Sequence, residues 1–142
     1  KAFGGAGLRV GYAIAPEPIA TWLRTAGGPY PVASLSIAIA SAIYKRREKR
    51  TPIIEQTRLN RDTLIETLKS QGIKAMESQA NFVLARFDDA ASVHAQLLDQ
   101  GISVRRFRTG SKIDQYLRIT VPADTVQLNQ LLNALGAIGA TP

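Results

Sequence analysis

The sequence opens on residues that could bind an anionic aldehyde. Lys1 is followed by glycines at positions 4, 5 and 7 and by an arginine, Arg9. An amine that has lost its proton can attack an aldehyde, a nearby cation favours that neutral form, and a guanidinium can bind phosphate. The lysine precedes the glycines, so the segment is neither a Walker loop nor a dinucleotide-binding fingerprint. Two alternatives remain, a lysine that bonds an anionic aldehyde cofactor and a solvated lysine at the surface.

A second candidate is an arginine in an apolar stretch near the end of the chain. Arg118 alternates with Leu117 and Ile119, and side chains that alternate in this way project from opposite faces of a strand. An arginine without an anion would be costly there. The pattern is consistent with a structural salt bridge, or with a guanidinium that binds the carboxylate of a small molecule through two hydrogen bonds.

The composition excludes several other kinds of site. The chain has no cysteine, which rules out disulfides and thiolate sites, and its single histidine, His94, cannot form a histidine-rich metal site. No Ser-His-Asp arrangement is present, and no pair of carboxylates has a spacing that suggests acid–base chemistry. We therefore expect no metal ion.

The chain is strongly basic. Its 18 Lys and Arg against 11 Asp and Glu give a formal net charge of +7, and residues 45–50 hold much of the excess. Charge alone binds the phosphate backbone of nucleic acids without recognising their sequence. No aromatic residue that could stack on a base interrupts this run, so we expect no nucleic-acid partner. No apolar run has the length of a transmembrane helix and no secretory signal is visible. We expect no membrane partner and a cytoplasmic location.

The first third of the chain predicts a strand followed by helices. Residues 8–15 are β-like and follow the glycine-rich segment. Two prolines open a short helix from residue 16 to about residue 24, which the glycines at 27 and 28 would end. Residues 33–45 are rich in alanine, isoleucine and serine, which predicts a closely packed helix.

Residues 51–142 predict a compact α+β unit. Thr51 can cap a helix whose first residue is Pro52, and Gly72 is placed to end it. Short strands and amphipathic helices follow, which indicates a small sheet covered by helices. The expected strands are 73–76, 81–87, 102–105 and 116–121, and the expected helices are 90–100 and 124–138.

The opening string resembles a known cofactor motif. Residues 1–12, Lys-Ala-Phe-Gly-x-Ala-Gly-Leu-Arg-Val-Gly-Tyr, are similar to the lysine motif of the fold-type I aminotransferases that use pyridoxal phosphate (PLP), and most closely to the histidinol-phosphate aminotransferases. Four later segments resemble motifs of that family in the same order. They are Pro-Tyr-Pro-Val at 29–32, Ser-Gln-Ala-Asn-Phe-Val-Leu at 78–84, Gly-Ile-Ser-Val-Arg at 101–105 and Tyr-Leu-Arg-Ile-Thr at 116–120.

The resemblance has small departures. Gly5, Pro31 and Pro122 stand where the family often has leucine, asparagine and glycine. The serine or threonine that normally precedes the family lysine is missing, because the sequence starts at Lys1. Five segments that match the family in the same order are more specific evidence than any one of them.

The resemblance implies an α/β fold and a division into domains. Residues 1–50 would be the C-terminal end of the large PLP-binding domain. Residues 51–142 would be the small α+β C-terminal domain, together with the helix that links the two domains.

The resemblance also implies roles for four residues. In the family, the lysine that matches Lys1 bonds PLP and shuttles a proton, and the arginine that matches Arg9 binds the cofactor phosphate. Arg118 matches the arginine that binds the substrate α-carboxylate. Arg105 matches an arginine that contributes to the anionic end of the substrate.

The activity that the resemblance implies is transamination. The favoured reaction moves an amino group between L-histidinol phosphate and 2-oxoglutarate in histidine biosynthesis, carried out by a homodimer. Close alternatives are another class I or II aminotransferase, for aromatic or other amino acids, and a phosphothreonine decarboxylase. A distant alternative is a non-enzymatic module that binds partners through its basic surface. An isolated chain of these residues is expected to be inactive, because it lacks the family's aspartate for the pyridine nitrogen of PLP.

Overall fold

The computed structural model describes residues 5–139, so the predictions for Lys1 lie outside the described residues. The chain falls into two compact units that divide between Thr51 and Pro52, and each unit is described by itself. None of the helices in the described part of the chain is both long enough and apolar enough to cross a membrane.

The first unit is mainly helical. It contains a 3-10 turn η1 (Ala6–Leu8), the helices α1 (Glu17–Ala26) and α2 (Ser34–Lys45), and the start of α3 (Arg47–Ser70). The helix expected to open at the two prolines is confirmed, and it ends before Gly28, whose φ of 70° is in the left-handed region that glycine tolerates. The helix expected over 33–45 is confirmed as α2.

The strand expected over residues 8–15 is wrong for this structure. Residues 10–16 have no regular structure, although the chain is β-like in sequence. A strand is defined by hydrogen bonds to a neighbouring strand, and none of the described residues pairs with this segment. Apolar, β-branched residues are therefore not sufficient without a partner strand.

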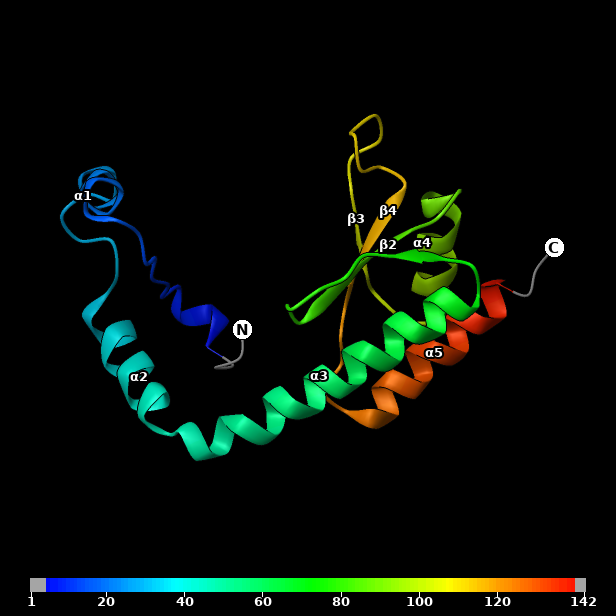
Figure 1. The fold of residues 1–142 in the computed structure, drawn as a ribbon, viewed down its shortest axis with the longest axis horizontal. Coiled ribbons are helices and arrows are strands. Elements are labelled where there is room, and N and C mark those ends of the chain that lie inside the picture. Colours follow the sequence, from blue (N-terminus) through cyan, green and yellow to red (C-terminus); the bar gives the residue numbers. More distant parts are fainter. Residues whose placement is uncertain (1–4, 140–142) are drawn as a thin grey trace. The chain divides into compact units, whose positions relative to one another are not determined.

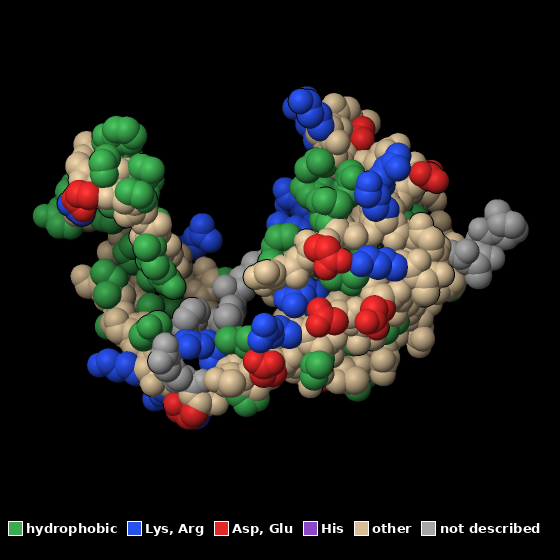
Figure 2. Space-filling view, in the orientation of Figure 1, with side chains coloured by type: hydrophobic (Ala, Val, Ile, Leu, Met, Phe, Trp, Pro, Cys, Tyr) green, Lys and Arg blue, Asp and Glu red, His purple; other side chains and the backbone are tan. Residues whose placement is uncertain are grey.

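The first unit has little core of its own. No residue of η1, α1 or α2 is buried. Large apolar side chains are open to solvent, including Ile14, Trp22 and Tyr30 with exposed fractions of 91%, 69% and 93%. Figure 2 shows hydrophobic side chains gathered over α1 and α2. An apolar surface of this kind is typical of an interface rather than of a free protein surface.

The second unit is a four-stranded antiparallel sheet with helices (Figure 1). The strand order is β1-β2-β4-β3, and the expected strands and helices are found with small shifts. The elements are β1 (Lys74–Ala75), β2 (Phe82–Arg86), α4 (Ala90–Asp99), β3 (Arg105–Arg106), β4 (Tyr116–Thr120) and α5 (Thr125–Gly139), together with α3 from Pro52 onward.

One face of this sheet forms the core. Val83 and Ala85 of β2 and Leu117 and Ile119 of β4 are at most 1% exposed, because α3, α4 and α5 supply leucines and valines that pack against them. Burying each large apolar side chain contributes about 1.5–3 kcal/mol. Alternation then places the side chains between these positions on the other face, which the three helices leave uncovered. We call this the open face.

The helix α3 begins earlier than the sequence predicts. Pro52 was expected at its first position, but the helix starts at Arg47, after a break at Arg46. Arg, Glu and Lys are good helix formers, and they extend the helix backwards through residues 47–50. Pro52 lies within the second turn, where its missing N–H leaves one helical hydrogen bond unmade. The two units divide at this proline.

The strand β3 is later and shorter than expected. Pairing was predicted for 102–105 but is found at Arg105–Arg106. Gly101 has a φ of 76°, and Ile102 donates its backbone N–H to Leu97 at the end of α4. The residues just after α4 are therefore hydrogen-bonded to the end of that helix, and pairing with the sheet begins only at Arg105.

Candidate functional site

The open face of the sheet carries Arg118. Its neighbours on β4, Leu117 and Ile119, are buried in the core, so alternation places Arg118 on the opposite face. Its register partners are Leu84 on β2 and Arg105 on β3. Residues directly opposite each other on antiparallel strands share a face. The sequence prediction that Arg118 projects from one face of a strand is therefore confirmed.

Arg105 and Arg118 form a like-charged pair across two strands. Among residues 5–139, no carboxylate forms an ion pair with either guanidinium. The Nε atom of Arg118 is buried and has no hydrogen-bond partner. Like charges directly opposite each other are unfavourable, and a buried donor without an acceptor costs about 1–3 kcal/mol. An anion placed between the two guanidiniums would relieve both costs.

The guanidinium of Arg118 does have one aromatic neighbour. Its Cζ atom lies 5.4 Å from the centre of the Phe82 ring, within the range of a cation–π interaction. Phe82 is on β2 opposite Thr120, which makes it a diagonal neighbour of Arg118 on the open face. The ring contacts the cation without neutralising its charge.

Other cations share the open face but differ in their contacts. Lys74 pairs with Arg86, and Arg86 pairs with Tyr116, so all three lie on this face. The guanidinium of Arg86 donates two hydrogen bonds to Oε1 of Gln115, at 3.0 and 2.8 Å. The four strands contain no acidic residue. The open face is therefore suited to a small anion, with Arg105 and Arg118 as the available guanidiniums.

Arg9, in the first unit, has an unusual backbone. It follows η1 with a φ of 55°, in the left-handed region, and donates its N–H to Ala6 at 3.3 Å. Such a conformation is uncommon for a residue with a side chain and often marks a functional position. The side chain of Arg9 is exposed.

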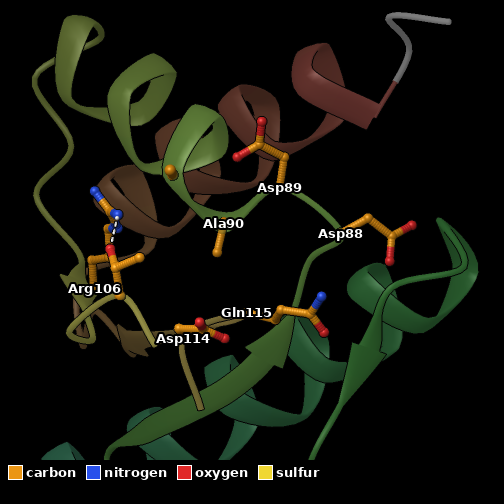
Figure 3. A pocket seen from close by; sticks show the side chains of 8 residues that line it. Asp88, Asp89, Ala90, Arg106, Asp114 and Gln115 are labelled. Atoms are coloured by element: carbon orange, nitrogen blue, oxygen red, sulfur yellow. Dashed lines mark hydrogen bonds between the residues drawn. The ribbon is translucent and has the colours of Figure 1, made fainter. Parts of the chain in front are cut away.

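A hollow of about 210 Å³ lies at a different place in the second unit (Figure 3). Its polar groups are largely engaged. Asp89 accepts a hydrogen bond from the N–H of Ser92 at 2.9 Å, Asp114 accepts one from Gly110 at 3.0 Å, and Arg106 donates to Thr109 at 3.0 Å. In the part of the chain that the structure describes, no three His, Cys, Asp or Glu side chains could hold a metal ion. The polar side chains that line this hollow therefore have structural roles, in capping a helix and in forming a turn.

Comparison with known proteins identifies the family. Residues 1–135 match the family model described as aminotransferase class I and II. The chain belongs to this aminotransferase family. A relative from Caldanaerobacter subterraneus subsp. tengcongensis, a histidinol-phosphate aminotransferase, is 41% identical over 142 residues, which is 97% of this chain and 39% of the relative. Another, from Pseudomonas entomophila, is 37% identical over 92% of this chain and 38% of the relative. The chain thus spans about two fifths of these aminotransferases.

Solved structures of other proteins share the fold. The histidinol-phosphate aminotransferase of Sinorhizobium meliloti, solved with pyridoxal-5'-phosphate, has a TM-score of 0.77 and 21% identity, over 98% of this chain and 39% of that chain. The L-threonine-O-3-phosphate decarboxylase of Porphyromonas gingivalis has a TM-score of 0.72 and 25% identity, over 96% of this chain and 43% of that chain. The expected α/β fold, with a small antiparallel sheet, is confirmed.

Sequence reasoning missed one residue of this site. Phe82 was recognised as part of a family-like motif but was given no role. Its position beside Arg118 depends on the register of β2 against β4, which a single sequence does not provide. One signal was available in the sequence. Apolar residues alternate in both segments, which indicates that Phe82 and Arg118 each lie on the face opposite the core.

Proposed function

We propose that this chain is the C-terminal part of a PLP-dependent transaminase. In this proposal, residues 1–50 complete a large cofactor-binding domain and residues 51–142 form the small domain. Membership of the aminotransferase family supports the reaction type. The observation that carries the substrate site is the pair of Arg105 and Arg118, which share the open face and have no described counter-ion.

The residues of the first unit fit the cofactor. Lys1 supplies the amine that holds PLP, and Arg9 supplies a guanidinium for its phosphate. The left-handed backbone of Arg9 is consistent with a residue whose position is set by a ligand. When bound, PLP supplies an electron sink for the negative charge that forms at the substrate α-carbon. Lys1 then carries the proton from the substrate α-carbon, as general base and acid.

The residues of the second unit bind the substrate. Arg118 donates two parallel hydrogen bonds to the α-carboxylate of the amino acid or 2-oxo acid. Arg105, directly opposite, adds a second cation for the anionic end. L-Histidinol phosphate has a phosphate in place of an α-carboxylate. Two adjacent guanidiniums suit this dianion better than a single guanidinium does. This favours an amino phosphate as one substrate and 2-oxoglutarate as the other.

The names of the relatives support the same choice. The relatives from Caldanaerobacter and Pseudomonas described above are histidinol-phosphate aminotransferases. A second candidate is a phosphothreonine decarboxylase, which the similarity to the Porphyromonas gingivalis enzyme favours. The homodimer that the family resemblance implies and the cytoplasmic location expected from the sequence are part of the same proposal.

The test uses a chimeric enzyme, which we call the graft. This chain replaces the matching 39% of the Caldanaerobacter relative, which retains its own upstream part. With PLP, the graft is assayed on L-histidinol phosphate and 2-oxoglutarate, on aromatic amino acids with 2-oxoglutarate, and on L-threonine O-3-phosphate. We expect the highest kcat/KM for L-histidinol phosphate. A preference for another amino donor, or release of carbon dioxide from L-threonine O-3-phosphate, would overturn the proposed substrate. Absence of all turnover in a folded graft would overturn the function.

A further inference from the structure

We propose that Phe82 is a positioning residue for Arg118, which its ring holds in place while leaving the hydrogen-bond donors of the guanidinium free for an anion. The consequence for substrate binding rests on the proposed function. The geometry itself does not, because it belongs entirely to the second unit.

A ring contact occupies the flat face of a guanidinium and not its hydrogen-bond donors. A guanidinium has five N–H donors, all in its plane, and its flat face can stack on an aromatic ring. The Cζ atom of Arg118 lies 5.4 Å from the centre of the Phe82 ring, and Nε of Arg118 has no hydrogen-bond partner. A carboxylate neighbour would have consumed these donors. The ring instead steadies the cation and leaves its donors available.

Hydrogen bonds fix the backbone of Phe82 and of the residues before it. The hydroxyl of Ser78 donates a hydrogen bond to the carbonyl of Phe82 at 2.7 Å and accepts one from the N–H of Ala80 at 3.1 Å. The guanidinium of Arg61, on α3, donates to the carbonyl of Ala80 at 3.3 Å. The start of β2 is therefore attached both to its own preceding turn and to a helix of the core, so the ring is presented from a fixed backbone.

The register explains why a large ring is needed at this position. Arg118 lies directly opposite Leu84, and Phe82 lies opposite Thr120. Diagonal neighbours of this kind have Cα atoms about 7–8 Å apart, a distance that aromatic and long side chains can bridge. Without the ring, the long side chain of Arg118 would sample more rotamers, and the cost of ordering it would fall on substrate binding.

The functional test uses the graft with Phe82→Leu and Phe82→Tyr. Loss of the ring should raise KM for 2-oxoglutarate by about threefold to tenfold, the size expected for one cation–π contact. The kcat at saturation and the absorbance of bound cofactor should stay close to those of the unsubstituted graft, because the contact is made before and during reaction alike. Phe82→Tyr keeps the ring and should restore KM.

Leu84→Met is the matched control, since Leu84 is the direct neighbour of Arg118 on the same strand as Phe82. It should leave KM unchanged. If Phe82→Leu leaves KM unchanged, lowers only kcat, or has the same effect as Leu84→Met, the proposed role of Phe82 is wrong. If the unsubstituted graft has no turnover, the proposed function fails, and the following measurement decides the role of Phe82.

The structural test uses the 142-residue chain and NMR. The Nε–Hε signal of Arg118, assigned through Arg118→Lys, should be displaced upfield by the ring current of Phe82. The displacement should disappear in Phe82→Leu, persist in Phe82→Tyr, and persist in Leu84→Met. An Arg118 signal that is the same in the unsubstituted chain and in Phe82→Leu would overturn the proposal, whatever reaction the enzyme catalyses.

Discussion

Arg105 on β3 and Arg118 on β4 lie directly opposite each other on the open face of the sheet, with no carboxylate paired to either among the described residues. Like charges directly opposite each other on neighbouring strands are unfavourable without a compensating charge. Under the proposed function, an anionic substrate explains the presence of this pair.

Arg118→Lys should weaken substrate binding in the graft. Lysine keeps the charge but loses the planar pair of donors that matches a carboxylate. The expected rise in KM for 2-oxoglutarate is about tenfold to a hundredfold, the size of one lost charge-assisted hydrogen bond. Bound cofactor, measured by absorbance, should be unchanged.

Arg86→Lys is the control for this change. Arg86 is on the same face, but its guanidinium is already bound to Gln115. The same substitution there should leave KM unchanged. An Arg118→Lys variant with an unaltered KM would favour the alternative that Arg118 is structural.

Arg105→Gln should stabilise the 142-residue chain slightly at low ionic strength. Removing one of two opposed like charges should raise the free energy of unfolding by a few tenths of a kcal/mol, up to about 1 kcal/mol. Arg108→Gln makes the same change of net charge in the following loop, outside the strands, and should have a smaller effect. Thermal unfolding in low salt compares the two variants. An Arg105→Gln chain that melts lower than Arg108→Gln would contradict the like-charge account.

Much of the second unit could be predicted from the sequence. Leu117, Arg118 and Ile119 alternate as strand residues do, and this is enough to place the arginine on the face opposite the core. Asp89 and Asp124 precede their helices and accept hydrogen bonds from the N–H groups of Ser92 and Gln127, as capping residues do. These features depend on neighbours within a few residues, which a single sequence displays.

The features that the sequence could not provide depend on distant partners. The pairing of Arg105 with Arg118 and the approach of Phe82 depend on strand register. The segment 8–15 has strand-forming residues but no strand to pair with in the described chain. Pro52 matches the pattern of a helix start, yet good helix formers before it move the start to Arg47.

Asn60→Leu should destabilise the second unit. Asn60 is 4% exposed, and its Nδ2 donates to the carbonyls of Pro122 and Ala123 at 2.8 and 3.3 Å. Leucine leaves these carbonyls without their donor, at a cost of about 1–3 kcal/mol. The melting temperature of the 142-residue chain should fall by several degrees. Asn133→Leu, at an exposed position of α5, should change the free energy of unfolding by less than about 0.5 kcal/mol. Equal losses in both variants would contradict the role of Asn60.

The 142-residue chain by itself should show no transaminase turnover. It spans 39% of the Caldanaerobacter relative, and none of its acidic residues has a setting suited to the pyridine nitrogen of PLP. The exposed side chains of Trp22 and Tyr30 indicate that the first unit needs a covering partner. Upstream polypeptide of the relative, supplied covalently or in trans, should restore turnover and PLP binding. Turnover by the chain alone, with PLP and both substrates present, would show that the site is complete without that polypeptide.

The most direct measurement of the central claim is the position of the bound cofactor. The graft is loaded with PLP, reduced with borohydride to make the bond between lysine and cofactor permanent, and digested for peptide mass analysis. We predict that the label lies on Lys1 and that Lys1→Arg abolishes both the label and turnover. A label on any other lysine, or a Lys1→Arg graft that is still labelled at the same level, would contradict the assignment of this chain as the part that carries the cofactor lysine.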